Sequence, residues 1–204
     1  MHFNKLIVLL ILLLTGCYQN EIMQKKEYIF GTIVEVTIYG ETKDHASDAI
    51  ELVFKEFRRL HNYLHPWKKS IIQDINQSIK NEKIYTTDDE EILSIIKHNK
   101  ELESMTSGYF NPAIGNLIEA WGFHRDQNAT DRPNSILIDN LQRNLPHMSE
   151  INIHRGYIES KNKNIQLDLG GYAKGYALDQ AKKILSENNI NNALINIGGN
   201  ILAL

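Results

Sequence analysis

The feature that most constrains the fold is a pair of adjacent glycines, Gly170 and Gly171, between two apolar segments. Residues 165–169 alternate apolar and polar side chains and predict a strand. Residues 173–185 carry apolar side chains at helical spacing and predict a helix. A strand, a tight glycine turn and a helix let a ligand approach the backbone, and the helix N-terminus favours an anionic group such as a pyrophosphate.

Charged residues flank the glycine pair. Lys174 adds a positive charge beside the predicted anion site, whereas the carboxylate of Asp168 suits a hydroxyl, an amino group or a metal ion. The spacing matches neither a dinucleotide-binding fingerprint nor a P-loop. Taken alone, the pattern is therefore also that of an ordinary turn between a strand and a helix.

The rest of the chain alternates predicted strands and helices. A strand is expected over residues 28–39, followed by a helix from Asp44 that Pro66 terminates. A second helix is expected to begin at Thr87, with Glu90 completing a capping box, and to end before Gly108. The remaining expectations are a helix over 135–145, short strands over 151–153 and 156–159, and a hairpin turning at Gly198 and Gly199.

The N-terminus indicates export. Residues 6–14 are an apolar run, too short for a membrane span of roughly 20 residues. The run closes on Thr15, Gly16 and Cys17, which resembles the lipobox of bacterial lipoproteins. We therefore expect a signal peptide over 1–16, a lipidated tether over 17–27 and a folded domain over 28–204. The chain would then be anchored in the cell envelope through lipid on Cys17, facing the periplasm or the cell exterior. The alternative is an ordinary secretory signal with an incidental cysteine.

Composition excludes some classes of protein. Cys17 is the only cysteine, so the chain forms no intramolecular disulfide. Lys and Arg total 22 against 25 Asp and Glu. This balance argues against a nucleic-acid partner, which would require a basic face.

Four segments carry a resemblance to a known family. Residues 167–177, Leu-Asp-Leu-Gly-Gly-Tyr-Ala-Lys-Gly-Tyr-Ala, resemble the signature of the ApbE family of FMN transferases. Phe30-Gly31-Thr32 resembles its opening Met-Gly-Thr strand. Residues 107–123, with Ser-Gly-Tyr-Phe-Asn-Pro and Trp-Gly-Phe, resemble its Gly-Ala-Phe-Asp-Pro and Trp-Gly-Phe segment, and residues 193–201 resemble its later Gly-Gly hairpin.

The resemblance implies a fold and a ligand pocket. The implied fold is α+β, an ApbE-like (T-fold-like) mixed sheet with packed helices. Asp168 and Lys174 would contact FAD, and the main-chain oxygen of Gly171 would bind Mg²⁺. The residues implied to line the flavin or adenine pocket are Phe30, Trp67, Tyr109, Phe110 and Asn111.

The resemblance also implies a reaction. A Thr or Ser hydroxyl of a target flavoprotein, such as one in electron transport, would attack the FMN phosphorus of FAD, and AMP would leave. Mg²⁺ would neutralise charge on the pyrophosphate. Two alternatives stay open: a lipoprotein that binds FAD without catalysis, and a hydrolase that gives FMN and AMP.

The sequence departs from the family pattern in several places. Phe30 replaces Met, Asn111 replaces Asp, and Leu-His-Pro-Trp at residues 64–67 stands for the Tyr-Arg-Pro loop. Family members continue beyond the position of Leu204, through a segment with a His and then a helix that supplies Asp and Thr to the metal. We therefore expect a fold incomplete at the C-terminus, with the catalytic base and two metal ligands in the missing region, and no activity from this chain alone.

Other local interpretations compete with the family roles. His61 and His65, four residues apart, could in principle ligate zinc, but no third ligand has a suitable spacing. Trp67 and Trp121 could be ordinary core or rim aromatics. Asn111 before Pro112 is most simply a helix cap with proline in the first turn.

Overall fold

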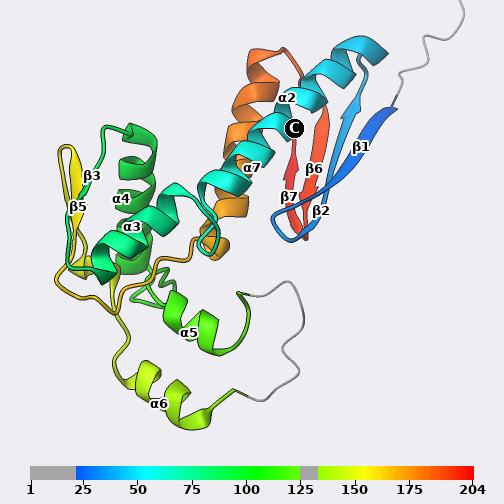
Figure 1. Cartoon of the computed structure of the whole chain (residues 1–204). Helices are drawn as coiled ribbons and strands as arrows, with labels where there is room; N and C mark the ends of the chain where they lie inside the picture. Colours follow the sequence, from blue (N-terminus) through cyan, green and yellow to red (C-terminus); the bar gives the residue numbers. More distant parts are fainter. Residues whose placement is uncertain (1–21, 125–132) are drawn as a thin grey trace, which may run out of the picture.

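A computed structural model describes residues 22–124 and 133–204 (Figure 1). The predicted signal peptide and Cys17 lie outside the described residues. The described chain is built around two antiparallel sheets, a larger one of four strands and a smaller one of three.

The larger sheet combines the two ends of the described chain. Its order is β1 (Ile22–Ile29), β2 (Thr32–Tyr39), β6 (Ala193–Ile197) and β7 (Asn200–Ala203). Strand β2 pairs with β6 so that Val34 lies opposite Ile197. This register places the turn between β1 and β2 beside the turn between β6 and β7, at one end of the sheet.

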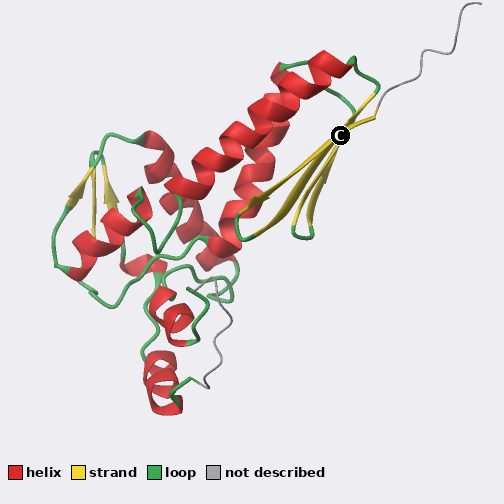
Figure 2. Ribbon diagram, turned by 45° about the vertical axis from the view of Figure 1, so that its right-hand side comes forward, coloured by secondary structure: helices red, strands yellow, loops and turns green. Residues whose placement is uncertain are grey.

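Two long helices cover one face of this sheet. They are α2 (Lys43–Tyr63) and α7 (Gly170–Glu187), which pack against each other and against the strands (Figures 1 and 2). Helix α2 begins at the cap Thr42 and buries a stripe with helical spacing. The stripe contains Ala46, Ala49, Ile50, Val53, Phe54, Phe57 and Leu60.

The smaller sheet has the order β3 (Tyr85–Thr86), β5 (Tyr157–Glu159) and β4 (Asn152–His154). Helix α3 (Ile71–Lys80) packs on β3 and β5, and α4 (Glu90–Met105) contacts a 3₁₀ turn at Met148–Glu150. Two short helices that pack together complete the described elements: α5 (Gly115–Ala120) and α6 (Ser135–Arg143).

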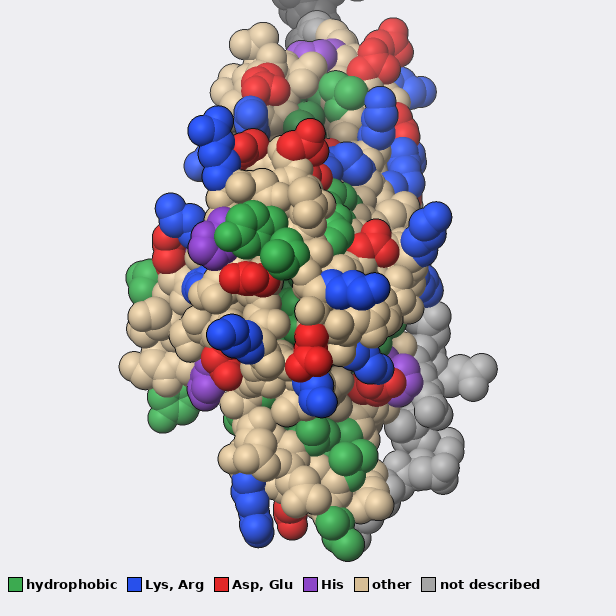
Figure 3. Space-filling view, turned by 60° about the vertical axis from the view of Figure 1, so that its left-hand side comes forward, with side chains coloured by type: hydrophobic (Ala, Val, Ile, Leu, Met, Phe, Trp, Pro, Cys, Tyr) green, Lys and Arg blue, Asp and Glu red, His purple; other side chains and the backbone are tan. Residues whose placement is uncertain are grey.

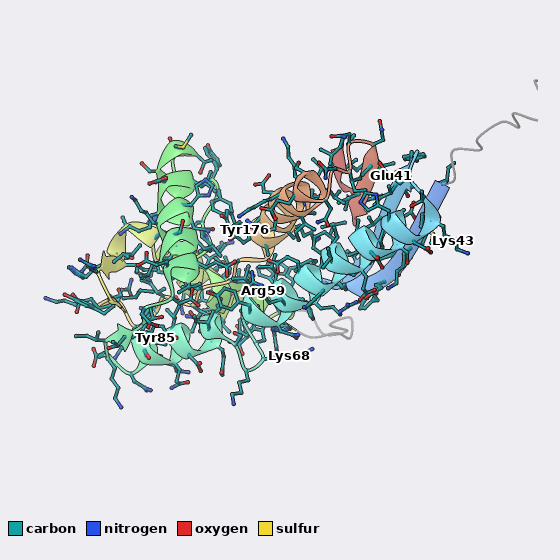
Figure 4. All side chains as sticks on the ribbon, turned by 90° about the horizontal axis from the view of Figure 1, so that it is seen from above. Glu41, Lys43, Arg59, Lys68, Tyr85 and Tyr176 are labelled. Atoms are coloured by element: carbon teal, nitrogen blue, oxygen red, sulfur yellow. The ribbon has the colours of Figure 1, made fainter. Side chains whose placement is uncertain are left out.

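Glu91, in the first turn of α4, connects the two parts of the molecule. Its carboxylate accepts two hydrogen bonds from Arg59 of α2, at 2.8 and 2.7 Å, and one from the Tyr176 hydroxyl of α7, at 3.0 Å. Figure 4 shows Arg59 and Tyr176 where these helices approach one another. Tyr63 of α2 adds a hydrogen bond of 2.7 Å to Asp89, the N-cap of α4.

The predicted α+β class is confirmed. All strand pairs in the two sheets are antiparallel, and the parallel pairing in the described residues is an isolated bridge between Ile114 and Gln166. None of the helices described in 22–124 and 133–204 is long and apolar enough to cross a membrane. On the face shown in Figure 3, acidic and basic side chains are interspersed.

The N-terminal prediction was wrong in two respects. Residues 28–39 form the end of β1 and all of β2, joined by Phe30 and Gly31 with φ of 56° and 72°. Two consecutive positive φ angles are typical of the tight turn that matches the twist of a hairpin. Residues 22–27, which we expected in the tether, are part of β1. Because β1 is a sheet edge with mostly exposed side chains, it lacks a clear apolar alternation.

Three further boundaries differ from the sequence prediction. Asp89, not Thr87, caps α4, and the Thr87 hydroxyl instead accepts a hydrogen bond from the Asp89 N–H. Gly170 and Gly171 form the first turn of α7 rather than a tight turn before it. Residues 165–169 are not a regular strand, because they pair through single bridges and side chains rather than with a sheet. Helices α3 and α5 were not predicted.

The segment before α7 is held along one side by residues 112–115. The Asp168 N–H donates to the Pro112 carbonyl at 2.9 Å, and Gly115 donates to the Gln166 carbonyl at 2.7 Å. The two segments approach so closely that a Cβ added to Gly115 would lie 2.6 Å from the Gln166 carbonyl oxygen. The pairing therefore requires glycine at position 115.

We predict that Gly115→Ala lowers the free energy of unfolding by about 1–3 kcal/mol, because the backbone of residues 166–168 must shift. Gly175→Ala is the matched control. A Cβ there meets nothing within 4 Å, and the site is in α7, so alanine should stabilise by about 0.5–1 kcal/mol. Urea unfolding of both variants measures the difference, and equal stability of Gly115→Ala and the wild type would contradict the prediction.

Candidate functional site

A cavity of about 920 Å³ lies at the end of the larger sheet where the β1–β2 turn meets the start of α7. Its walls come from this turn, the C-terminal end of α2 with the following loop, the end of α5 with the residues after it, and Asp168 with the first turns of α7. Its volume is near the upper end of the roughly 300–1,000 Å³ usual for ligand pockets.

Four of the residues that the sequence predicted for the site line this cavity. Phe30 comes from the β1–β2 turn, Trp67 from the loop after α2, Asp168 from the segment before α7, and Lys174 from the second turn of α7. Phe30 and Trp67 are 37 positions apart in the sequence, Trp67 and Asp168 are 101 apart, and Asp168 and Lys174 are 6 apart. The fold therefore brings Phe30 and Trp67, which only the resemblance had linked to the site, into one cavity with Asp168 and Lys174.

The predicted segment 109–111 does not line the cavity. Tyr109 is 97% exposed, and the Phe110 ring lies 3.6 Å from where a Cβ of Gly171 would be. Phe110 thus contacts the start of α7 from outside the cavity lining. The main-chain oxygen of Gly171 stays a predicted ligand, since the neighbouring Gly170 is the glycine in the lining.

Asn111 has a different local role from the one expected. Its side chain accepts a hydrogen bond from the Ala113 N–H at 2.9 Å and donates to the Pro146 carbonyl at 2.9 Å. No helix begins there, because α5 starts at Gly115. The helix-cap interpretation was wrong, and Asn111 instead fixes the turn that leads into residues 112–115.

One wall of the cavity is a row of rings. The Phe30 ring makes an edge contact with His61 at 5.8 Å between centroids, and His61 makes one with His65 at 5.5 Å. Phe30 also packs on the buried Phe57 at 6.1 Å, which ties the row to the core. On another wall, Trp67 lies 5.5 Å from the ring of His124. Such walls suit a planar aromatic ligand.

The position of Trp67 depends on His65. The Nδ1 atom of His65 accepts hydrogen bonds from the N–H groups of Trp67 and Lys68, both at 3.1 Å. This nitrogen must carry a lone pair, so the hydrogen bonds select the tautomer with the proton on Nε2. Among the described residues, no group of three or more His, Cys, Asp or Glu is placed to hold a metal ion.

The charged side chains of the cavity have both signs. Lys68 and Lys174 are positive, whereas Asp168 and Glu119 are negative. Figure 4 shows Lys68 in the loop that follows α2. Lys174 and the positive end of the α7 helix dipole form the part of the lining that favours an anion.

Asp168 lines the cavity and also forms a hydrogen bond with the start of α7. Its Oδ1 accepts a hydrogen bond of 2.8 Å from the Gly170 N–H, the first amide of α7. Leu169, which occupies the N-cap position of α7, makes no capping hydrogen bond with its own side chain. Asp168 therefore acts as the cap of α7 from one residue further out.

Tyr172 fixes the first turn of α7 from the side of α4. Its hydroxyl lies 3.1 Å from Nδ1 of His98, and its ring stacks on Tyr176 with centroids 5.6 Å apart. Burial raises the pKa of Tyr172 to about 12, so the phenol stays neutral near physiological pH. The contact between the start of α7 and α4 is thus made by the neutral phenol of Tyr172.

Sequence reasoning missed several residues of the lining. His61 was considered only as a zinc ligand, His65 as a zinc ligand and as part of the segment 64–67, and Lys68, Glu119 and His124 were not considered at all. Phe123, in the lining and 76% exposed, belongs to the Trp-Gly-Phe segment, which was a signal for that wall. The position of Lys68 next to Trp67 was a second available signal.

Known proteins resemble this chain in sequence over most of its length. A model of the ApbE family matches residues 30–204. An FAD:protein FMN transferase of Rhodobacter capsulatus is 32% identical over 177 residues, which are 87% of this chain and 34% of that protein. One of Buchnera aphidicola subsp. Schizaphis graminum is 28% identical over 202 residues, 95% of this chain and 58% of that protein.

Solved structures show the same fold. The ApbE protein of Thermotoga maritima superposes with a TM-score of 0.78 at 24% identity, over 90% of this chain and 59% of that one. The flavin transferase ApbE of Vibrio cholerae gives a TM-score of 0.74 at 17% identity, over 90% and 59%. The chain thus spans about one third to three fifths of the length of the proteins it matches.

We predict that Asp168→Ala destabilises the protein by about 1 kcal/mol, because the Gly170 N–H loses its acceptor. Asp168→Asn keeps an oxygen at the Oδ1 position and should lose less. Urea unfolding at neutral pH compares the two variants. If asparagine costs as much as alanine, the charge of Asp168 rather than its hydrogen bond stabilises the start of α7.

Proposed function

The chain belongs to the ApbE family, and on this premise we propose that the protein is an FAD:protein FMN transferase. The observation that carries the proposal is the cavity that places Phe30, Trp67, Asp168 and Lys174 around the N-terminus of α7. The names of the relatives from R. capsulatus and B. aphidicola support the same activity.

We assign the parts of FAD by chemistry. The isoalloxazine or adenine ring would lie against Phe30 and Trp67, whose faces and edges suit a planar heteroaromatic system. The pyrophosphate would lie at the first turn of α7, with Lys174 as its cation. The carboxylate of Asp168 repels phosphate, so it would accept a hydrogen bond from a hydroxyl or ring N–H of the ligand.

The proposed reaction is phosphoryl transfer to a protein. A Thr or Ser hydroxyl of a target flavoprotein attacks the FMN-side phosphorus of FAD and loses its proton. The new P–O bond joins FMN to the target, the bond within the pyrophosphate breaks, and AMP leaves. The contribution of the described residues is positioning and electrostatics: they fix the ring and the pyrophosphate relative to the open mouth of the cavity.

Mg²⁺ is part of the proposal through the resemblance, with the Gly171 carbonyl as a ligand. The described residues do not form a magnesium site by themselves, because a hard cation prefers about six oxygen ligands and no cluster of acidic groups lies here. We therefore derive no step of the reaction through the ion.

Two other activities use the same cavity. A hydrolase would pass the FMN group to water and release FMN and AMP, whereas a binding protein would hold FAD unchanged. The three activities differ in which hydroxyl reaches the phosphorus. Their products, namely flavinylated protein, free FMN or intact FAD, distinguish them directly.

We predict that Lys174→Met lowers FMN transfer by about tenfold or more, since a hydrogen bond to a charged group contributes about 1.5–3 kcal/mol. Lys182→Met, an exposed lysine of the same helix outside the cavity lining, is the matched control and should act like the wild type. The assay incubates protein from the full reading frame with FAD, Mg²⁺ and a Thr-containing acceptor. Covalent flavin fluorescence of the acceptor is read in a denaturing gel.

The assay also decides between the alternatives. Free FMN without labelled acceptor would favour the hydrolase, and FAD recovered intact would favour the binding protein. Equal losses in Lys174→Met and Lys182→Met would remove Lys174 from the proposed site.

For its location, we propose that the protein is anchored in the cell envelope through lipid on Cys17 and faces the periplasm or the exterior. The apolar run 6–14 followed by Thr15, Gly16 and Cys17 supports this. The proposed partners are then FAD, flavoproteins that carry an acceptor hydroxyl and the membrane, with no nucleic acid.

We predict that Cys17→Ser leaves the precursor without lipid and moves the protein out of the detergent phase in a Triton X-114 partition. Thr15→Ser is the control, because it keeps a small hydroxyl residue before the cysteine. Detergent partitioning that is unchanged in Cys17→Ser would contradict anchoring through this residue.

A further inference from the structure

Asn76 of α3 makes an unusual contact with the segment before α7. The side chain is buried, with Asn76 3% exposed. The oxygen and the nitrogen of its amide group both form hydrogen bonds with the backbone of a single residue, Leu167. Its Nδ2 donates to the Leu167 carbonyl at 2.9 Å, and its Oδ1 accepts from the Leu167 N–H at 2.7 Å. The two residues are 91 positions apart in the sequence.

This contact completes the backbone pairing of residues 166–168, since residues 112–115 pair with only one side of that segment. Gln166 and Asp168 donate their N–H groups to the carbonyls of Ala113 and Pro112. In an extended segment, the backbone groups of the intervening Leu167 point the other way. Asn76 meets them there, so its amide takes the place of a neighbouring strand. A buried backbone N–H and carbonyl would otherwise lack partners.

The position of Asp168 depends on this arrangement. Leu167 is fully buried and directly precedes Asp168, whose carboxylate lines the cavity and caps Gly170. Asn76 itself is not in the lining. Loss of the two Leu167 hydrogen bonds would therefore alter the cavity by letting the backbone of residues 167–170 shift.

Resting on the proposed function, we propose that Asn76 is a positioning residue for FAD binding. By fixing Leu167 from α3, it holds Asp168 and the start of α7 in the arrangement that accepts the ligand. This role predicts a preorganised site: the segment 166–170 has its binding geometry before FAD arrives.

The test is FAD binding by Asn76→Ala in protein from the full reading frame, measured by quenching of flavin fluorescence. If the segment holds the competent geometry about a tenth of the time without Asn76, the Kd for FAD rises about tenfold. Two controls separate this effect from a general loss of stability. Asn99→Ala removes an equally buried asparagine that donates only to Ile95 of its own helix, and Ile79→Ala destabilises α3 without removing Asn76.

The outcomes are distinct. A raised Kd in Asn76→Ala, with both controls near the wild type, supports the inference. A Kd unchanged in Asn76→Ala, or raised equally in Ile79→Ala at matched thermal stability, overturns it while leaving the proposed function intact. A wild type that binds no FAD contradicts the proposed function, and the inference fails with it.

A second measurement needs no variant. In the wild type without FAD, the Leu167 amide should be protected from hydrogen exchange as strongly as the amides in the middle of α7. Exchange of the Leu167 amide on the timescale of exposed loops would overturn the inference, because the bond to Asn76 would then not hold the segment before the ligand binds.

Discussion

The structure depends on how residues 165–169, a buried segment outside both sheets, find hydrogen-bond partners for their backbone N–H and carbonyl groups. Residues 165–169 carry three fully or almost fully buried side chains, so they cannot leave their N–H and carbonyl groups to water. Residues 112–115 pair with one side, and Asn76 pairs with the other. The backbone of the segment is thereby paired on both sides, as that of a strand inside a sheet is, directly before α7 begins.

The junction at Glu91 extends this constraint to the whole molecule. Arg59 and Tyr176 bring α2 and α7 to the first turn of α4, where a carboxylate also suits the positive end of the helix dipole. The cavity lies on the same two helices, at the C-terminal end of α2 and the N-terminal end of α7. Contacts that join the two parts of the molecule therefore act on the same two helices that line the site.

Much of the site could be predicted from sequence because its residues lie in recognisable segments. Phe30, Asp168 and Lys174 were identified in this way, although the turn at Phe30 and the early start of α7 were missed. Helix α3 was also predictable: Ile72, Ile75 and Ile79 have helical spacing after the cap Ser70. Asn76 then interrupts that apolar face with a polar side chain, which is a signal for a buried partner.

Other parts had no local signal. The tautomer of His65 and the position of Trp67 follow from backbone N–H groups that converge only after the loop has folded. The absence of residues 109–111 from the lining follows from how that turn is tied to Pro146, 35 positions from Asn111. A long-range contact such as that between Asn111 and Pro146 is set by packing, so spacing along the chain carries no trace of it.

The choice of glycine after Asp168 and Leu169 has a steric reason as well as an electrostatic one. The carboxylate of Asp168 bends back to the Gly170 N–H so closely that a Cβ on Gly170 would lie 3.0 Å from its Oδ1. The cap and the first glycine are therefore coupled, since a side chain at 170 would displace the carboxylate. At Gly171 the nearest atom to an added Cβ is a ring carbon of Phe110 at 3.6 Å, an ordinary contact. The first glycine thus serves the helix cap, whereas at the second the surroundings leave room for a Cβ.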